Sequence, residues 1–255
     1  MSEQSSKTAL VTGAAKRLGR EIALGLAADG WDIVVHYRNS AEEALATVEN
    51  IRKLGRRSVA LNCDLSSEQE TRALLPRAIE ALGPVSCVVN SASLFDYDDA
   101  RTFTSNHLDA HMRANVTAPV LLAQALHQSL PEEGRAVVIN LLDQKLFNPN
   151  PDFLSYTLSK AALQTATTLL AQALAPKLRV VGLAPGLTMV SGDQTEEGFA
   201  AAHRHTPLGK SSTPADIAAA TCYLASAPAV TGTVLVVDGG LHLMPLNRDV
   251  MFLAK

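Results

Sequence analysis

Residues 11–19 read Val11-Thr12-Gly13-Ala14-Ala15-Lys16-Arg17-Leu18-Gly19 and lie between the first short apolar run and the first helical pattern of the chain. Gly13 permits a tight turn, and Gly19 permits close packing of a helix against a strand. Backbone N–H groups at the start of such a helix can bind a pyrophosphate. The stretch therefore predicts a strand, a phosphate-binding turn and a helix, in that order.

Three cations, Lys16, Arg17 and Arg20, crowd the start of this helix. The positive end of a helix dipole disfavours each cation by roughly 0.3–1 kcal/mol, and a bound polyanion would reverse that balance. We therefore expect these side chains to face an anion. The alternative is that they are ordinary solvated charges on the surface.

Outward from this turn, short apolar runs alternate with segments of helical periodicity. Strands that are apolar on both faces and separated by helices indicate a parallel sheet covered on both sides. The sequence predicts an α/β fold with a single domain over residues 1–255, built as a Rossmann-type doubly wound parallel sheet of about seven strands with helices on both faces. The expected strands are 8–12, 33–36, 58–61, 85–90, 136–141, 179–183 and 233–237, and the expected helices are 18–28, 41–54, 68–82, 109–130, 156–175 and 214–225.

Local signals mark several helix ends. Ser40 followed by Glu43 is a capping-box pattern, which predicts the start of the second helix. Pro214 suits the first position of the last helix, and Pro176 is expected to close the helix before it.

Composition narrows the class of protein. Of 255 residues, 47% are hydrophobic and 18% charged, a balance typical of globular chains and not of disordered ones. The net charge of −3 and the lack of a long basic run argue against nucleic acid or a membrane as the main partner. No secretory signal or membrane-spanning run is visible, and the three scattered cysteines fit buried thiols in a reducing cytoplasm: Cys63, Cys87 and Cys222.

Four histidines form two close pairs in the sequence, His107 with His111 and His203 with His205. Two nitrogens without a third ligand are weak evidence for a metal. We expect all four to be exposed histidines and expect no metal site.

The end of the second strand selects between cofactors. An NAD-binding protein usually has a carboxylate there for the ribose 2′-OH. This chain instead has His36-Tyr37-Arg38-Asn39-Ser40, with no acid until Glu42. Arg38, Ser40 and Arg17 suit a 2′-phosphate, so the sequence predicts NADPH/NADP in preference to NADH.

A Tyr-x-x-x-Lys pattern, Tyr156 and Lys160, lies in a predicted helix. Residues four apart share one helix face, so the phenol and the ammonium can approach the same site. The positive charge is expected to lower the pKa of the phenol and to make Tyr156 a proton donor near neutral pH. Taken alone, the pattern would suit a surface pair.

Further motifs follow in order: Asp64, Asn90-Ser91-Ala92, Asn115, Ala184-Pro185-Gly186 and Val237-Asp238-Gly239-Gly240. With the turn and the Tyr–Lys pair, the chain resembles the short-chain dehydrogenase/reductase superfamily over nearly its whole length. The resemblance implies that Asp64 contacts adenine, Asn115 holds a water in a proton relay, Lys160 binds the nicotinamide ribose and Tyr156 is the acid. The cofactor-binding positions expected in total are Gly13, Arg17, Leu18, Gly19, His36, Tyr37, Arg38, Asn39, Ser40, Asp64, Leu65, Asn90, Ser91, Ala92, Tyr156, Lys160, Pro185 and Gly186.

The chain departs from the family pattern in four places. Most members have Gly at Arg17, Asn at Ser91, Gly at Ser93, and a Ser 13 residues before the Tyr, where this chain has Asp143. A carboxyl with a raised pKa suits proton donation to a nitrogen heterocycle better than polarisation of a carbonyl. The catalytic residues expected are therefore Asp143, Tyr156, Lys160 and Asn115. The alternative is that Asp143 pairs with Lys145 on a loop.

The same departures, together with Phe95 and the Asn140-Leu141-Leu142-Asp143 run, resemble pteridine reductases and the related dihydromonapterin reductases, also called alternative dihydrofolate reductases. The resemblance implies that Phe95 stacks on a pterin and that Ser93 helps to hold it. Read alone, Phe95 would suit a core position. The substrate-binding residues expected are Ser93, Phe95, Asp143, Tyr156 and Leu187. The implied activity is NADPH-dependent hydride transfer to a C=N bond of a dihydropterin such as dihydromonapterin, dihydrobiopterin or dihydrofolate.

Residues 187–212 are expected to form a substrate lid, with Gly192 and Gly198 giving mobility. The apolar segment 241–255 is expected to pack on a neighbouring subunit of a homotetramer. Two other functions stay open: a ketone or alcohol oxidoreductase, and a non-catalytic NADPH sensor. Asp143 argues against the first, and the Asn–Tyr–Lys set argues against the second.

Overall fold

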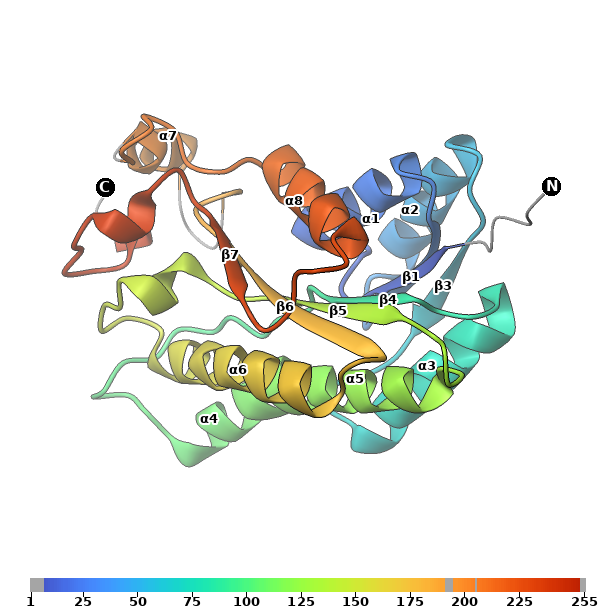
Figure 1. Cartoon of the computed structure of the whole chain (residues 1–255). Helices are drawn as coiled ribbons and strands as arrows, with labels where there is room; N and C mark the ends of the chain where they lie inside the picture. Colours follow the sequence, from blue (N-terminus) through green and yellow to red (C-terminus); the bar gives the residue numbers. More distant parts are fainter. Residues whose placement is uncertain (1–6, 191–194, 205, 253–255) are drawn as a thin grey trace.

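A computed structural model describes residues 7–190, 195–204 and 206–252. Seven parallel strands form one sheet at the centre of the molecule (Figure 1). The order is β3-β2-β1-β4-β5-β6-β7, which confirms the predicted doubly wound sheet. The strands are β1 (Thr8–Val11), β2 (Asp32–Tyr37), β3 (Ser58–Asn62), β4 (Cys87–Asn90), β5 (Ala136–Leu141), β6 (Leu178–Pro185) and β7 (Val234–Val237).

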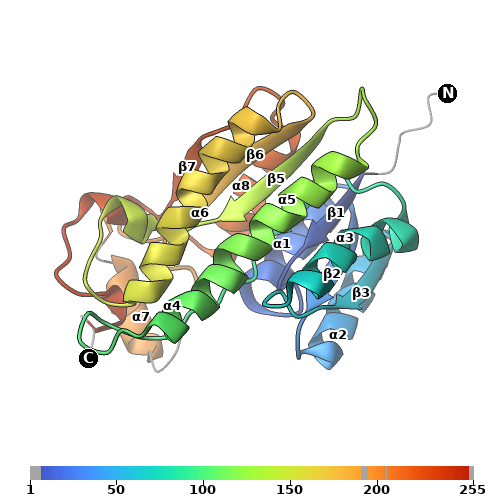
Figure 2. The same ribbon diagram turned by 90° about the horizontal axis from the view of Figure 1, so that it is seen from below.

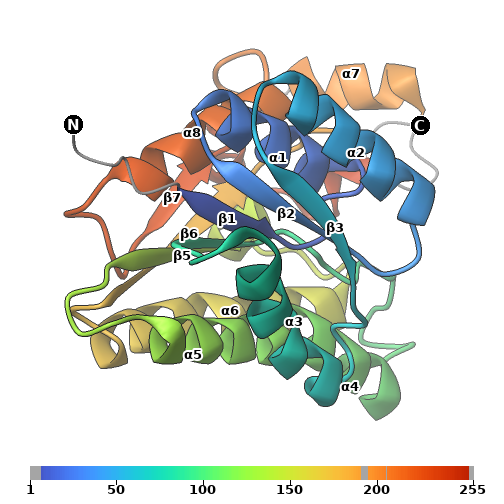
Figure 3. The same cartoon turned by 90° about the vertical axis from the view of Figure 1, so that its right-hand side faces the viewer.

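Helices cover both faces of the sheet. Figures 1 and 3 show α1, α2 and α8 on one face and α3, α4, α5 and α6 on the other. A further helix, α7, lies at the end of the molecule where the C-terminal segment also lies (Figure 1). The bounds are α1 (Arg17–Ala28), α2 (Ala41–Lys53), α3 (Glu68–Leu82), α4 (Ser105–Met112), α5 (Ala118–Ser129), α6 (Leu154–Ala173), α7 (Glu196–Arg204) and α8 (Pro214–Ser226).

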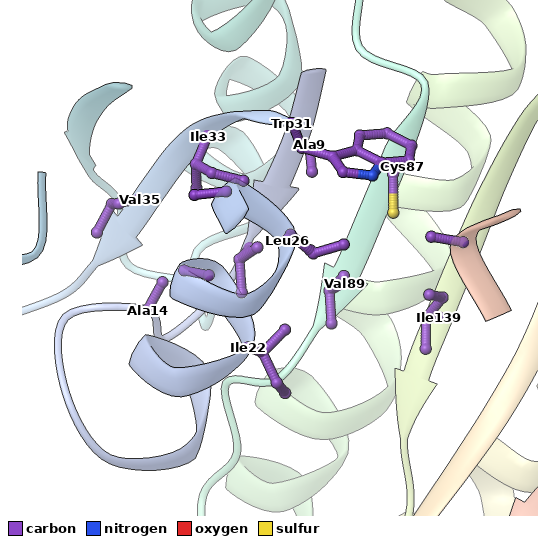
Figure 4. Close-up of a cluster of buried hydrophobic side chains, with 14 of the residues drawn as sticks. Ala9, Ala14, Ile22, Leu26, Trp31, Ile33, Val35, Cys87, Val89 and Ile139 are labelled. Atoms are coloured by element: carbon purple, nitrogen blue, oxygen red, sulfur yellow. The ribbon is translucent and has the colours of Figure 1, made fainter. Parts of the chain in front are cut away.

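The core has two main layers because alternate residues of each strand face opposite sides. Ile33, Val89 and Ile139 pack with α1 on one side, as the close-up in Figure 4 shows. Leu10 and Val138 belong to the second layer, with α3 and α5. Every residue of β1, β4 and β5 is buried, which is why their sequences are apolar without alternation.

A polar link crosses this apolar interior. Asn90 and Asn140 are paired in register on β4 and β5, and Asn90 Nδ2 donates to Asn140 Oδ1 at 2.8 Å. Asn140 Nδ2 in turn donates to the Thr167 hydroxyl of α6 at 2.9 Å. The link joins two strands to the helix that carries Tyr156.

The strand order reverses between β1 and β4, which are hydrogen-bonded neighbours. In open parallel sheets a crevice forms outside the carboxyl ends of the strands at such a switch point. The residues that follow β1 and β4 here are the glycine turn at Gly13 and the Ser91-Ala92 pair. The fold therefore brings these two predicted segments to one place.

The predicted helix 109–130 is wrong in its start and its regularity. Helix α4 begins at Ser105 because the Thr104 side chain caps it, accepting the His107 N–H at 3.2 Å. A π-helical segment, η1 (Arg113–Thr117), then joins α4 to α5, and the two helices follow one line in Figure 2. π-Helical turns are rare and often occur at functional sites.

Two other local predictions need correction. Ser40 occupies the cap position of α2 but makes no capping hydrogen bond, since its backbone is not extended. The expected lid contains helix α7, and Gly198 lies inside that helix; Gly192 and the rest of 191–194 lie outside the described residues. Thr213 and Pro214 start α8 with a full capping box.

The histidines are not all exposed, contrary to expectation. His111 is fully buried and stacks on His107, with the ring centroids 4.7 Å apart. His203 is half-buried and binds the Leu187 carbonyl, while His205 lies outside the described residues. Cys63 and Cys87 are buried, and Cys222 is partly buried against the core. Within the ranges that the structure describes, no helix is long and apolar enough to cross a membrane.

Candidate functional site

A cavity of about 1000 Å³ lies at the carboxyl ends of the strands. It brings together 19 of the predicted site residues: Gly13, Arg17, Leu18, Gly19, His36, Tyr37, Arg38, Asn39, Ser40, Asp64, Leu65, Ser91, Ala92, Ser93, Asp143, Tyr156, Lys160, Pro185 and Gly186. Four predicted residues do not line it: Asn90, Phe95, Asn115 and Leu187.

The glycine turn is too tight for any side chain at its two glycines. Gly13 has φ +65°, and a Cβ there would lie 3.0 Å from the Ala92 Cα. A Cβ on Gly19 would lie 2.3 Å from the Gly13 carbonyl oxygen. Thr12 completes the turn, because its hydroxyl accepts the N–H groups of Ser91 and Ala92 at 3.0 Å each. Only glycine fits at these two positions, because the backbone of the protein itself occupies the space of a side chain.

The His36 side chain holds the glycine turn by a hydrogen bond to Gly13. Its Nδ1 accepts the Gly13 N–H at 3.0 Å, and its Nε2 lies 3.0 Å from the Cys63 carbonyl. These partners require a neutral ring with the proton on Nε2. Burial lowers the pKa of His36 to about 4, so this tautomer persists at neutral pH. His36 acts on the cavity wall by holding Gly13 in place.

Arg17, the first residue of α1, has φ +54°, a left-handed backbone conformation that glycine adopts far more readily. Its guanidinium donates to the Val190 carbonyl at 2.8 Å, across the cavity mouth. The Lys16 side chain also lines the cavity, and no side chain caps the first turn of α1. Arg20 departs from expectation, since it pairs with Glu21 at 2.7 Å and does not line the cavity.

Arg38 and Ser40 lie at the same end of the cavity, where β2 stops. Asp64, after β3, faces this end too, but its carboxylate already accepts the Ser66 N–H at 2.9 Å and the Ser66 hydroxyl at 2.8 Å. These hydrogen bonds lower the pKa of Asp64. The polar groups left at the end of β2 are a cation and a hydroxyl, which suit a phosphate.

Asp143 and Tyr156 meet at the opposite end of the cavity. The Tyr156 hydroxyl donates to Asp143 Oδ2 at 2.7 Å. The other oxygen, Oδ1, accepts the Lys145 backbone N–H at 2.8 Å, so the Lys145 ammonium is not the partner of this carboxylate. Asp143 therefore faces the candidate catalytic tyrosine.

The acidity of this pair differs from expectation. Burial, followed by the Asp143 carboxylate, raises the pKa of Tyr156 well above its usual value. Burial also raises the pKa of Asp143. The predicted lowering of the Tyr156 pKa is wrong because the phenol is buried and, in addition, a carboxyl group and not the ammonium is its hydrogen-bond partner. Burial therefore makes both groups harder to deprotonate than they are in water.

Lys160 sits one helical turn beyond Tyr156 on the buried face of α6, with 3% of its surface exposed. Its ammonium donates to the Leu141 carbonyl at 2.7 Å and lies 5.6 Å from the centre of the Tyr156 ring. Burial lowers the pKa of Lys160 to about 8. The ammonium thus lines the cavity between the tyrosine and the end of β5.

Asn115 lies in η1 and is buried. Its side chain bonds both backbone groups of Leu94, accepting the N–H at 2.8 Å and donating to the carbonyl at 3.0 Å. It also donates to the Ser159 hydroxyl at 3.0 Å, and that hydroxyl donates to the Tyr156 carbonyl at 2.7 Å. In this structure Asn115 therefore ties the segment after β4 to α6 from outside the cavity.

Phe95 belongs to an aromatic cluster that sequence reasoning missed. It stacks on Phe153 with the centroids 4.3 Å apart and meets Tyr156 edge-on at 4.7 Å. Tyr97 and Phe252 also pack on Phe153. Phe153 comes three residues before Tyr156, a spacing that could have placed it on the same side of the helix start.

The other two predicted residues that do not line the cavity, Asn90 and Leu187, make contacts within the fold. Asn90 is buried in the link to Asn140, and its Oδ1 has no hydrogen-bond partner. Thr188 lines the cavity where Leu187 was expected, because the Leu187 carbonyl accepts a bond from His203 at 2.7 Å. Among the residues described, no group of three or more His, Cys, Asp or Glu is placed to hold a metal ion.

Comparisons with known proteins agree with this architecture. A family model described as enoyl-(acyl carrier protein) reductase matches residues 13–242. An uncharacterised oxidoreductase from Methylorubrum extorquens is 34% identical over 95% of this chain and 100% of its own length. 3beta-hydroxysteroid dehydrogenase 1 from Eggerthella lenta is 33% identical, over 94% of this chain and 95% of its own.

A solved structure is also similar over nearly the whole chain. FolM alternative dihydrofolate reductase 1 from Brucella canis, complexed with NADP, superposes with a TM-score of 0.90 at 35% identity, covering 95% of this chain and 96% of that one. The matched span, the shared sheet and the level of identity lead to one conclusion: the chain belongs to the short-chain dehydrogenase/reductase family.

Proposed function

We propose that this chain is an NADPH-dependent reductase of dihydropterins that adds hydride to a ring carbon and a proton to the adjacent ring nitrogen of a C=N bond. The observation that carries the proposal is the 2.7 Å hydrogen bond between Tyr156 and Asp143 inside the cavity. A carboxyl group with a raised pKa can donate a proton to nitrogen. The Ser that most family members have at the position of Asp143 would instead polarise a carbonyl.

The cavity fits a dinucleotide. The turn at Gly13 and Gly19 leaves no space for side chains, and Arg17, Lys16 and the uncapped first turn of α1 offer cationic and N–H groups to a pyrophosphate. Arg38 and Ser40 would hold a 2′-phosphate, and Lys160 would reach the nicotinamide ribose. The NADP in the Brucella structure supports this assignment. When bound, NADPH supplies the hydride.

The proton comes from the Asp143–Tyr156 pair. Because burial disfavours the anionic form of both groups, the pair keeps its proton until the substrate nitrogen becomes more basic. Tyr156 or Asp143 then donates a proton to that nitrogen, and the pair carries one more negative charge than before. The Lys160 ammonium, close to the Tyr156 ring, stabilises that charge.

Positioning falls to the groups around the pair. Asn115, through Ser159, holds the backbone carbonyl of Tyr156 and so fixes the start of α6. Phe95 has 37% of its surface exposed beside Tyr156 and offers a flat face for stacking on a heterocycle. Ser93, exposed at the same rim, would bind a polar edge of the substrate.

A second candidate is reduction of a ketone, which the hydroxysteroid dehydrogenase relative favours. The two functions are separated by incubating the purified chain and NADPH with a dihydropterin, with dihydrofolate and with a panel of ketones, and following NADPH oxidation. Turnover of the dihydropterin above all ketones is expected. Turnover of ketones alone would replace the proposal with the second candidate, and no turnover would leave an NADPH-binding sensor.

The same assay compares NADPH with NADH at matched low concentrations. Arg38 and Ser40 favour the phosphorylated cofactor through charge-assisted hydrogen bonds, each worth about 1.5–3 kcal/mol. Equal rates with the two cofactors would contradict the proposal that Arg38 and Ser40 bind the 2′-phosphate.

A further inference from the structure

The segment 248–252 folds back onto the turn that carries Asp143. This turn is η2 (Gln144–Phe147), for which Asp143 is the cap residue, and the segment ends in η4 (Val250–Phe252). More than 100 residues separate them in sequence. In Figure 1 the C-terminal segment lies at the same end of the molecule as α7, and η4 contacts α7.

Lys145 is the first link between the segment and the turn. Only 3% of its side chain is exposed, so its ammonium must find partners inside the protein. It donates to the Asp152 carbonyl and to Asp249 Oδ2, the latter at 3.3 Å. The backbone N–H of the same lysine donates to Asp143 Oδ1 at 2.8 Å. One residue thus connects Asp249 to the catalytic carboxyl.

Asp152 is the second link. Its carboxylate accepts the Asp249 N–H at 2.8 Å and the Arg248 Nε at 2.8 Å and 3.0 Å. Asp152 and Lys145 are both nearly inaccessible to solvent. The carboxylates of Asp152 and Asp249 thus lie among two cations, Lys145 and Arg248. The carboxylates compensate the buried positive charge of Lys145.

Aromatic rings make a third link. Phe252 packs on Phe153 with the centroids 6.1 Å apart and meets Tyr97 edge-on at 5.6 Å. The Arg248 guanidinium lies 4.8 Å from the centre of the Phe252 ring. Phe153 in turn stacks on Phe95, which touches Tyr156. The segment thus reaches both members of the catalytic pair.

We propose that Asp249 is a positioning residue, which holds the Lys145 turn so that Asp143 meets Tyr156 at hydrogen-bond distance. The proposal rests on the proposed function, since it gives Asp143 and Tyr156 the part of proton donors. The alternative is that Asp249 only packs the C-terminal segment and has no influence on the pair.

Electrostatics separates the two possibilities. The groups that face Asp143 are Lys145 from its own turn, Tyr156 and Lys160 from α6, and Asp249 from the C-terminal segment. The negative charge of Asp249 raises the pKa of Asp143 and of Tyr156, in each case as a smaller cause than burial. Removing that charge would let both groups lose their protons at lower pH. An Asp249 with no influence on the pair would not shift this titration, and an Asp249 that does not hold the turn would leave amide exchange there unchanged.

The experiment compares Asp249→Asn, which removes the charge and keeps the shape, with Asp249→Glu, which keeps the charge. Glu133→Gln is the matched control, because Glu133 is 92% exposed in the loop before β5, at the other end of the sheet. Each full-length variant is assayed for kcat and KM with NADPH and a dihydropterin between pH 5 and pH 10. Amide hydrogen exchange is measured at Leu146 and Asn148, whose N–H groups bond the Asp143 and Lys145 carbonyls.

For Asp249→Asn we expect a roughly tenfold lower kcat, little change in KM and faster exchange at both amides. The alkaline limb of its kcat profile moves to lower pH, while Asp249→Glu and Glu133→Gln keep the wild-type limb. Unchanged exchange at Leu146 and Asn148 overturns the proposal, and so does an unchanged limb. If the wild-type chain reduces no dihydropterin, the proposed function fails by itself. Exchange at Leu146 and Asn148 then decides alone, and unchanged exchange overturns the positioning role.

Discussion

The helices that carry the two ends of the cavity, α1 and α6, both start at a residue with a left-handed backbone that is not glycine. Arg17 begins α1 at φ +54°, and Phe153 precedes α6 at φ +55°. Such a residue costs on the order of 1–3 kcal/mol, and surrounding structure must compensate. Phe153 is 5% exposed and packs between aromatic rings, whereas Arg17 is exposed and donates to the Val190 carbonyl.

The contrast distinguishes two ways of building a site. At the start of α6, the strained residue is compensated by packing, and the same packing orders the catalytic end. At the start of α1, little packing compensates the strain, so a bound anion is the natural partner of Arg17. On the proposed function, the end of the cavity at Arg17 is completed by its ligand, and the end at Tyr156 is completed by the protein.

The largest expected effect separates the two ends by function. Tyr156→Phe and Asp143→Asn each remove one member of the proton-donating pair, and turnover of the dihydropterin should fall about 10²–10⁴-fold. NADPH affinity, measured by fluorescence titration, should stay within about threefold, since the cofactor end keeps its turn.

Tyr223→Phe on α8 is the matched control for the tyrosine, because Tyr223 is 57% exposed and does not line the cavity. Near wild-type turnover in both Tyr156→Phe and Asp143→Asn would show that the pair is not the proton source.

The next effect tests the strain itself. Phe153→Gly relieves the backbone but loses a buried ring, and we expect a loss of about 3 kcal/mol in the free energy of unfolding. Arg17→Gly relieves the same conformation at an exposed site and should gain about 1 kcal/mol. Chemical denaturation of the chain without cofactor measures both.

Arg17→Gly should also weaken NADPH binding about tenfold or more, because it removes a cation from the cavity. Arg20→Ala serves as its control, since Arg20 pairs with Glu21 outside the cavity. A lower stability of Arg17→Gly in the absence of cofactor would contradict the contrast between the two helix starts.

The last expected effect concerns His36, which holds the turn at the cofactor end and whose titration changes the stability only at acidic pH. Its pKa falls from the usual 6.5 to about 4 on folding, so between these values only the unfolded chain binds the proton. The stability that this neutral ring contributes is complete above pH 6.5 and is lost as the pH falls toward 4, by up to about 3 kcal/mol.

His36→Gln cannot titrate, so its free energy of unfolding should depend less steeply on pH between 4 and 6.5 than that of the wild type. His127→Gln, in the last turn of α5, provides the comparison for loss of a histidine elsewhere. Parallel curves for wild type and His36→Gln would mean that Gly13 is held by other groups.

The sequence predicts the regular half of the molecule well for a physical reason. Strands such as β5, buried over all six residues, need a mostly apolar run, and this run, broken only by Asn140, is visible in the sequence. The cofactor end follows from it, because its residues sit on or next to strand ends. Gly13 and His36 are examples, each at most two residues from a strand boundary.

The catalytic end was predicted less completely because its contacts are distant in sequence. Asp143 and Tyr156 were expected from the family resemblance, and their hydrogen bond spans 13 residues. The Lys145–Asp249 pair spans 104 residues, and no local pattern marks it. The segment 241–255 was expected to cover a neighbouring subunit, yet Arg248, Asp249 and Phe252 pack on their own chain. The homotetramer stays a prediction.

The amide pair on β4 and β5 bears on how the chain finds its alignment while folding. Val137, Val138 and Ile139 are so alike that sliding β5 along β4 by two residues would leave apolar side chains on the same faces. Such a slip would separate Asn90 from Asn140 and leave a buried amide without a hydrogen-bond partner. The apolar side chains of these strands hardly discriminate between registers. The Asn90–Asn140 pair therefore favours one register and makes the others cost free energy.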